Sequence, residues 1–140
     1  MSTETFITLE DRGRVAVVRL NRPEKRNALT RAMLERLAEL FQSFGARPEL
    51  RAVILHGAGA EAFCAGTDIA ELDALDAEGA RLASERGQRV CDLVEACPVP
   101  VVAAVNGLAA GGGFELALAC HLRVASSEAR FSLSETRLGL

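Results

Sequence analysis

The stretch VVAAVNGLAAGGGFELALA, residues 101–119, indicates the fold class of this 140-residue chain. Its first five residues are apolar and either small or β-branched, which is typical of a buried strand. An Asn-Gly pair then interrupts the strand, and the glycine run at 111–113 leads into a helix predicted over residues 112–119. A buried strand, a glycine-rich turn and a helix in succession predict an α/β protein in which sheet layers are backed by helices.

The flanking sequence continues this alternation of strands and helices. Residues 52–56 predict a short buried strand, and apolar residues at helical spacing predict a helix from its N-cap Thr30 to Gly45. A longer helix is predicted over residues 80–96, and its inward positions are Leu82, Val90, Leu93, Val94 and Cys97. The other predicted elements are a hairpin of residues 5–9 and 14–20, a loop over 57–66, a short helix over 68–75, and strands over 99–105, 122–125 and 130–133. The strands at 53–55 and 99–105 carry apolar runs, so we expect them to be buried on both faces.

Composition excludes several classes of protein. The net charge is only -3 with both signs interspersed, and Trp and Tyr are absent, so neither a basic stripe nor an aromatic ladder suggests nucleic-acid binding. Residues 1–10 lack the basic and apolar regions of a secretory signal. Residues 96–114 carry no charge, but two prolines, an Asn-Gly pair and the glycine run argue against a membrane span.

The cysteine pattern predicts structural thiols rather than a metal site. The four cysteines form no C-x-x-C pair and only two histidines accompany them, so no zinc site is expected. We interpret them as small buried hydrophobic residues in a reducing compartment and expect the protein to be cytoplasmic.

Two glycine-rich passages from strand to helix, residues 57–68 and 106–115, are candidates for chemistry. Glycine lets another group approach the backbone, and a helix start leaves N–H groups without partners. If both passages faced one point, they would form an oxyanion hole, whereas each alone could be a tight turn. The first passage also matches the dinucleotide pattern G-x-G-x-x-A, with Glu78 about 20 residues beyond. Residues 63–66 interpose a second loop, however, which disfavours that interpretation.

Glu115 and Glu135 are a candidate acid–base pair if the fold brings them together. Each also has a structural interpretation. Glu115 falls in the first turn of its predicted helix, where it favours the helix dipole, and Glu135 completes a capping box with Ser132. Spacing along the sequence does not decide between these roles.

Taken together, these segments resemble the enoyl-CoA hydratase/isomerase (crotonase) family. The resemblance is carried, in the family's order and spacing, by residues 21–23 (NRP), 27–29 (NAL), 62–69 (AFCAGTDI), 104–107 (AVNG), 111–117 (GGGFELA) and 131–140 (FSLSETRLGL). It spans essentially the whole chain. The fold that it implies is an α/β, crotonase-like (ClpP/crotonase) ββα spiral, with residues 1–140 as one core domain. Family chains run to about twice this length, so we expect an N-terminal core portion without the C-terminal helices that close the acyl pocket and build trimers.

The resemblance also implies residue roles. The backbone N–H groups of Thr67 and Gly112 would form the oxyanion hole, and Glu115 and Glu135 would be the catalytic glutamates. The positions implied for substrate and coenzyme A binding are Lys25, Ala28, Ala65, Asp68, Ile69 and Ala70. The implied reaction is syn addition of water to a 2-enoyl-CoA, giving a 3-hydroxyacyl-CoA. It needs no metal and no cofactor apart from the coenzyme A of the substrate, and the full-length form is expected to be a trimer or a dimer of trimers.

Three alternatives stay open from the sequence. The first is enoyl-CoA isomerisation or another acyl-CoA reaction of the same family, although members that isomerise commonly lack one or both glutamates. The second is a non-catalytic remnant that binds acyl-CoA or a partner without turnover. The third is the nucleotide-binding domain suggested by the first glycine passage.

Overall fold

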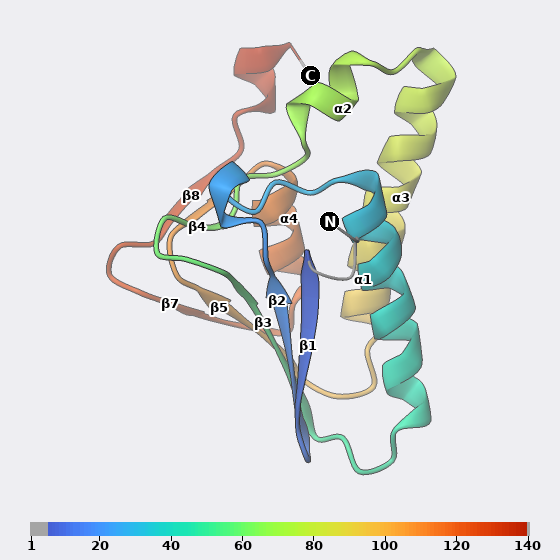
Figure 1. Cartoon of the computed structure of the whole chain (residues 1–140), viewed down its shortest axis with the longest axis vertical. Helices are drawn as coiled ribbons and strands as arrows, with labels where there is room; N and C mark the ends of the chain where they lie inside the picture. Colours follow the sequence, from blue (N-terminus) through green and yellow to red (C-terminus); the bar gives the residue numbers. More distant parts are fainter. Residues whose placement is uncertain (1–5, 140) are drawn as a thin grey trace.

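The computed structural model describes residues 6–139, which form two sheets and four α-helices (Figure 1). The main sheet has five strands in the order β1-β2-β3-β5-β7, and the second has three in the order β4-β6-β8. The helices and strands are β1 (Ile7–Arg12), β2 (Val15–Leu20), α1 (Arg31–Ser43), β3 (Ala52–Gly57), β4 (Ala62–Cys64), α2 (Ile69–Asp73), α3 (Ala77–Glu95), β5 (Val101–Val105), β6 (Leu108–Ala110), α4 (Gly112–Ala119), β7 (Leu122–Ala125) and β8 (Arg130–Ser132).

Strand direction explains how the chain crosses between layers. β1 and β2 form an antiparallel hairpin in which Ile7 pairs with Leu20, and the remaining neighbours in both sheets are parallel. Parallel neighbours need crossover connections, which α1 and α3 supply between β2, β3 and β5. The two helices run side by side along one flank of the main sheet (Figure 1). This arrangement confirms the predicted α/β class, in which sheet layers are backed by helices.

The core lies between the main sheet and these helices. It includes Phe44, Leu37 and Met33 from the α1 region, Leu55 from β3 and Val94 from α3, all of which are buried. The prediction that the strands at 53–55 and 99–105 are buried on both faces is wrong. Their residues alternate between buried and half-buried because helices cover only one face of the sheet within residues 6–139.

Two short strands were not predicted. β4 lies inside the segment expected to be a loop at 57–66, and β6 lies between the Asn-Gly pair and the glycine run. Each has three residues, too few to establish an alternating pattern in sequence. Their pairing with each other and with β8 builds the second sheet, so tertiary contacts define them rather than local propensity.

The predicted helices are present with shifted ends. Thr30 caps α1 by accepting the N–H of Met33 at 3.2 Å, as expected, but α1 ends at Ser43 and is followed by a 3₁₀ turn, Phe44–Ala46. The long helix begins at Ala77, earlier than predicted, because Asp76 caps it through the N–H of Gly79. Leu82 was expected to face inward but is 40% exposed, since the first turns of α3 extend beyond the sheet.

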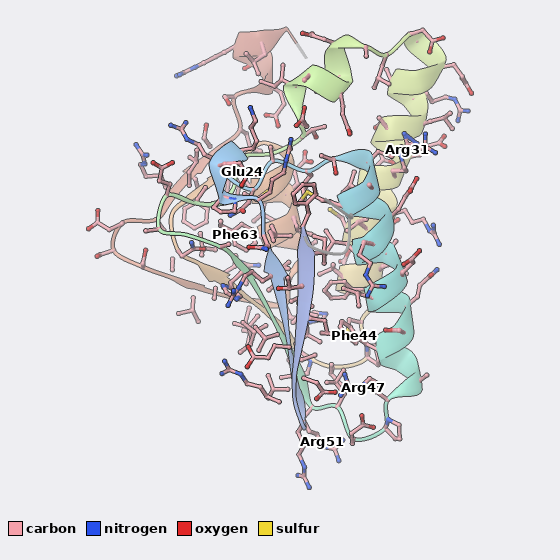
Figure 2. The ribbon with its side chains drawn as sticks, in the orientation of Figure 1. Glu24, Arg31, Phe44, Arg47, Arg51 and Phe63 are labelled. Atoms are coloured by element: carbon pink, nitrogen blue, oxygen red, sulfur yellow. The ribbon has the colours of Figure 1, made fainter. Side chains whose placement is uncertain are left out.

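The segments that carry the predicted site residues lie towards one end of the molecule (Figure 1). In Figure 2, Glu24 marks the 3₁₀ turn Pro23–Lys25, while Arg47 and Arg51 lie at the opposite end of the sheet. The first residue of the predicted hairpin, Thr5, lies outside the described residues. None of the helices described is both long and apolar enough to span a membrane.

Candidate active site

The polar loop of residues 21–30 is held in place by the side chain of Asn27. Its Oδ1 accepts the backbone N–H of Arg22 at 2.9 Å, and its Nδ2 donates to the carbonyl oxygens of Ala58 and Ala62, each at 3.0 Å. Asn27 is the only fully buried polar residue within residues 6–139, so these bonds compensate for its loss of solvation. Its backbone is left-handed (φ 58°), a conformation in which Asn is enriched.

The loop then pairs with the segment that carries Thr67. Leu29 donates its N–H to the carbonyl oxygen of Gly66 at 2.7 Å and accepts the N–H of Asp68 at 2.9 Å. A peptide unit is planar and trans, so the N–H of Thr67 points opposite to the C=O of Gly66. The bond to Leu29 therefore directs the N–H of Thr67 away from the loop.

A second N–H group comes from the start of α4. Gly111 precedes the helix in the left-handed region (φ 53°), and its carbonyl oxygen accepts the N–H of Glu115 at 3.0 Å. The N–H of Gly112 shares a peptide unit with that carbonyl, so it points out of the helix start, where no partner exists inside the helix.

The two N–H groups lie close together. A Cβ added at Gly66 would be 3.4 Å from the nitrogen of Gly112, and a Cβ added at Gly112 would be 3.8 Å from the nitrogen of Thr67. The fold thus brings together the two glycine-rich passages that the sequence singled out. The Thr67 side chain is exposed, so this place is open to solvent within the part of the chain that the structure describes.

Both predicted glutamates adjoin Gly111. A Cβ added at Gly111 would lie 2.7 Å from Oε1 of Glu135, which puts the Glu135 carboxylate against the start of α4. β8 brings it there, because the N–H of Gly111 bonds to the carbonyl oxygen of Ser132 at 2.9 Å. Glu115 occupies the first turn of α4 and is exposed.

The interpretation of Glu135 as part of a capping box with Ser132 is wrong. Residues Glu135–Leu138 form a 3₁₀ turn that begins at Glu135 itself, and the preceding Ser134 makes no side-chain capping bond. Glu135 is therefore not the third residue of a capped helix. Its carboxylate lies beside Gly111 instead.

The surroundings of the site shift the pKa values of two side chains, Asp68 and Cys91. The hydrogen bond from Arg22 is the main cause that holds the pKa of the Asp68 carboxyl below its usual value. Burial, followed by the nearby Glu115 carboxylate, raises the pKa of the Cys91 thiol on α3 to about 11. Helix α4, which carries Glu115, packs against α3.

The remaining predicted site residues surround Thr67 at different depths. Lys25 is exposed on its 3₁₀ turn, and Ala28 and Ala65 are half-buried. Ile69 is 59% exposed and begins α2 together with the exposed Ala70.

Asp68 differs from these residues because its polar groups are engaged within the chain. Its N–H bonds to Leu29, and its carboxylate bonds to Arg22 and to the N–H of Glu71. The sequence alone does not predict the pairing of Asp68 with Arg22. It offers two unlike charges in two separate family motifs, and only the fold shows that they meet.

The dinucleotide interpretation of the first glycine passage is wrong. A dinucleotide fingerprint opens directly into a helix, whereas residues 57–61 run into strand β4. Within residues 6–139 no group of three or more His, Cys, Asp or Glu side chains could hold a metal ion.

Comparison with known proteins agrees with this architecture. The chain belongs to the enoyl-CoA hydratase/isomerase family, whose sequence model matches residues 10–140. It is 42% identical over 134 residues to the short-chain-enoyl-CoA hydratase of Clostridium acetobutylicum, a match that covers 96% of this chain and 51% of that protein. It is 41% identical to the crotonyl-CoA hydratase of Syntrophomonas wolfei, over 96% of this chain and 52% of that protein.

A solved structure shows the same likeness. The crystal structure of an enoyl-CoA hydratase from Bacillus anthracis superimposes with a TM-score of 0.93 at 39% identity, covering 96% of this chain and 53% of that one. The chain spans about half the length of the curated relatives that it matches.

Proposed function

We propose that this chain forms the thioester-binding and catalytic part of an enoyl-CoA hydratase, which adds water in the syn sense to a 2-enoyl-CoA and yields a 3-hydroxyacyl-CoA. The observation that carries the proposal is the closeness of the Thr67 and Gly112 backbone nitrogens, with the Glu135 carboxylate against the adjoining Gly111. Two N–H donors on one point suit a carbonyl oxygen that gains negative charge.

In the proposed mechanism, these N–H groups donate hydrogen bonds to the thioester oxygen and polarise the C=O, which makes C3 electrophilic. Glu115 and Glu135 hold one water molecule. Glu115 accepts a proton as the water attacks C3, and Glu135 supplies a proton to C2. The proton therefore moves from the water to Glu115, and the proton that C2 gains comes from Glu135.

Retention of both glutamates supports hydration over the other reactions of the family. An isomerase moves a proton along the acyl chain and adds no water, so it does not need two groups to hold a water molecule. Isomerisation of an enoyl-CoA is the second candidate reaction. The presence of Glu115 together with Glu135 is the observation against it.

Assay with crotonyl-CoA tests the proposal. Hydration removes the conjugated enone, so its ultraviolet absorbance should fall in proportion to the 3-hydroxyacyl-CoA formed. The outcome against hydration is conversion of a 3-enoyl-CoA to the 2-enoyl isomer with no loss of crotonyl-CoA. Binding of acyl-CoA without turnover of either substrate would favour a non-catalytic binding module.

The proposal extends to the setting of the whole protein. The four cysteines are free thiols, which favours a reducing compartment and supports a cytoplasmic location. We also propose that coenzyme A enters only as part of the substrate, and that the full-length form assembles as a trimer or a dimer of trimers.

A further inference from the structure

The ion pair between Arg22 and Asp68 differs from every other ion pair within residues 6–139. Nη1 of Arg22 lies 2.6 Å from Oδ2 of Asp68, and their side chains are only 15% and 12% exposed. In each of the other pairs at least one side chain is more than half exposed. Exposed pairs contribute little to stability, whereas breaking a sheltered pair leaves a charge without compensation.

Both partners are held on several sides. Nη1 of Arg22 also donates to the carbonyl oxygen of Ala28 at 3.2 Å, and the guanidinium carbon lies 5.7 Å from the ring centre of Phe6. The second carboxylate oxygen of Asp68 accepts the N–H of Glu71 at 3.1 Å and so caps α2. Since each oxygen of this carboxylate already has a partner, it is poorly placed to bind substrate.

Thr67 is the residue that this arrangement fixes. On one side, the carbonyl of Gly66 is bound by the N–H of Leu29, and this bond sets the peptide plane that contains the N–H of Thr67. On the other side, the N–H of Asp68 bonds to the carbonyl oxygen of Leu29, and Arg22 holds its side chain. Arg22 thereby ties the polar loop to Asp68 at one end of this segment, while Leu29 ties it to Gly66 at the other.

We propose that Arg22 and Asp68 are positioning residues, which set the direction of the Thr67 N–H towards the thioester oxygen without touching substrate. This inference rests on the proposed function. It gives Asp68 a role through the backbone in place of the substrate contact implied by the family resemblance. A small rotation of the Thr67 peptide would misalign one of two donors, and loss of one such donor typically costs about 10²–10³-fold in rate.

Four variants distinguish an effect of losing the Arg22–Asp68 pair from an effect of losing any ion pair on the surface. Asp68→Asn keeps the size and the capping ability of the side chain but removes its charge. Arg22→Met removes the guanidinium, and Arg22→Lys restores a charge without the planar guanidinium, whose Nη1 bonds to both Asp68 and Ala28. Glu35→Gln is the matched control, because it breaks the exposed Arg31–Glu35 pair, which lies 2.8 Å apart on α1.

The first measurement is amide hydrogen exchange of Leu29 and Asp68 in the free protein. These two N–H groups make the bonds that flank Thr67. We expect them to exchange at least about ten-fold faster in Asp68→Asn and Arg22→Met than in the wild type, with the Leu37 and Leu40 amides of α1 unchanged. Glu35→Gln should match the wild type. Unchanged exchange at Leu29 and Asp68 in both variants would overturn the proposal.

The second measurement is the infrared carbonyl stretch of bound crotonyl-CoA labelled with ¹³C at the thioester carbon. In the wild type the band should move to lower frequency, and in Asp68→Asn and Arg22→Met it should return towards the value of the free thioester, with Arg22→Lys between them. A purely structural role would reduce the amount bound and leave the frequency of the bound thioester unchanged. A full shift retained in both variants would overturn the positioning role while the proposed function stands. A wild-type protein whose bound thioester shows no shift would overturn the proposed function itself.

Discussion

The carbonyl oxygen of Cys64 occupies the space where a side chain at Gly113 would begin. A Cβ added at Gly113 would lie 2.1 Å from this oxygen and 2.7 Å from the carbonyl carbon, both of which belong to the backbone of β4. Helix α4 therefore approaches the second sheet as closely as a backbone without side chain permits. This contact sets where the start of α4, with the N–H of Gly112, lies relative to Thr67.

The neighbouring glycines should respond differently to alanine. Gly113→Ala must push α4 away from β4, and we expect a loss of stability at or above the roughly 1–3 kcal/mol typical of overpacking. Gly112→Ala is the matched control, because its Cβ would meet Oγ1 of Thr67 at an ordinary contact distance of 3.5 Å. Chemical denaturation of both variants checks this, and equal stability would contradict the close packing.

The candidate oxyanion hole should depend on backbone and not on the side chain of Thr67. Thr67→Ala should change turnover of crotonyl-CoA little, because the exposed side chain is not the donor. Gly112→Val should reduce turnover by about 10²–10³-fold, since its branched side chain would crowd the approach to both N–H groups. Steady-state kinetics test the pair. A large defect in Thr67→Ala beside an active Gly112→Val would refute the backbone assignment.

The two glutamates should matter for turnover more than for binding. In the full-length context, Glu115→Gln and Glu135→Gln keep the shape of the side chain but remove its acid–base function. General acid–base catalysis contributes roughly 10²–10⁴-fold, so we expect kcat with crotonyl-CoA to fall within that range and KM to change much less. Glu128→Gln, a change at an exposed glutamate on the β7–β8 connection, is the control. If either variant turns over near the wild-type rate, the role proposed for that residue is wrong.

Alkaline pH should destabilise the protein through Cys64. Burial raises the pKa of this thiol to about 12, so the folded state keeps its proton at pH values where the unfolded state loses it. The stabilisation is complete below about pH 9 and is lost as pH rises towards 12, at up to about 1.4 kcal/mol per pH unit for one thiol.

Urea unfolding at pH 7.5 and pH 10.5 measures this effect. The difference in unfolding free energy between the two pH values should be smaller in Cys64→Ala than in the wild type. The variant will be less stable at both pH values because of the cavity, so the pH-dependent difference is the quantity that decides. An equal difference in both proteins would contradict the buried, protonated thiol.

The chain of 140 residues expressed alone should associate with itself. Large apolar side chains are exposed on α4, β7, β8 and the segment after β8: Leu118, Leu122, Val124, Phe131 and Leu133. Apolar patches beyond a few hundred Å² promote association, and β7 and β8 are end strands of their sheets within residues 6–139. We also expect such a chain to hydrate crotonyl-CoA poorly, because an open pocket admits water.

Light scattering with a paired substitution checks the association. Leu122→Lys with Val124→Lys should shift the protein towards monomer, whereas Leu82→Lys should not, because Leu82 is exposed on α3 away from these strands. Concentration should be determined at short wavelength, since Trp and Tyr are absent. A monodisperse wild-type chain that melts cooperatively as a monomer would contradict this prediction.

The sequence by itself determined the elements with strong local signals. Helix α1 followed from its apolar stripe and from Thr30, whose hydroxyl caps it as predicted. The strand β5 and the helix α4 followed from an apolar run, a glycine turn and a helical run read in succession. The family could also be predicted from the sequence, because its motifs keep their order and spacing. The matching family model confirms this prediction.

Only the tertiary structure decided how distant segments meet. The strands β4 and β6 exist because they pair with each other, not because three residues favour a strand. The proximity of Thr67 to Gly112 depends on Leu29 holding one segment and on the close contact of Gly113 with Cys64 holding the other. Arg22 and Asp68 are 46 residues apart. The strength of their ion pair depends on how far the two side chains are buried, which the local sequence does not predict. Contacts of this kind are set by the packing of whole layers, so spacing along the chain predicts their residue types but not their geometry.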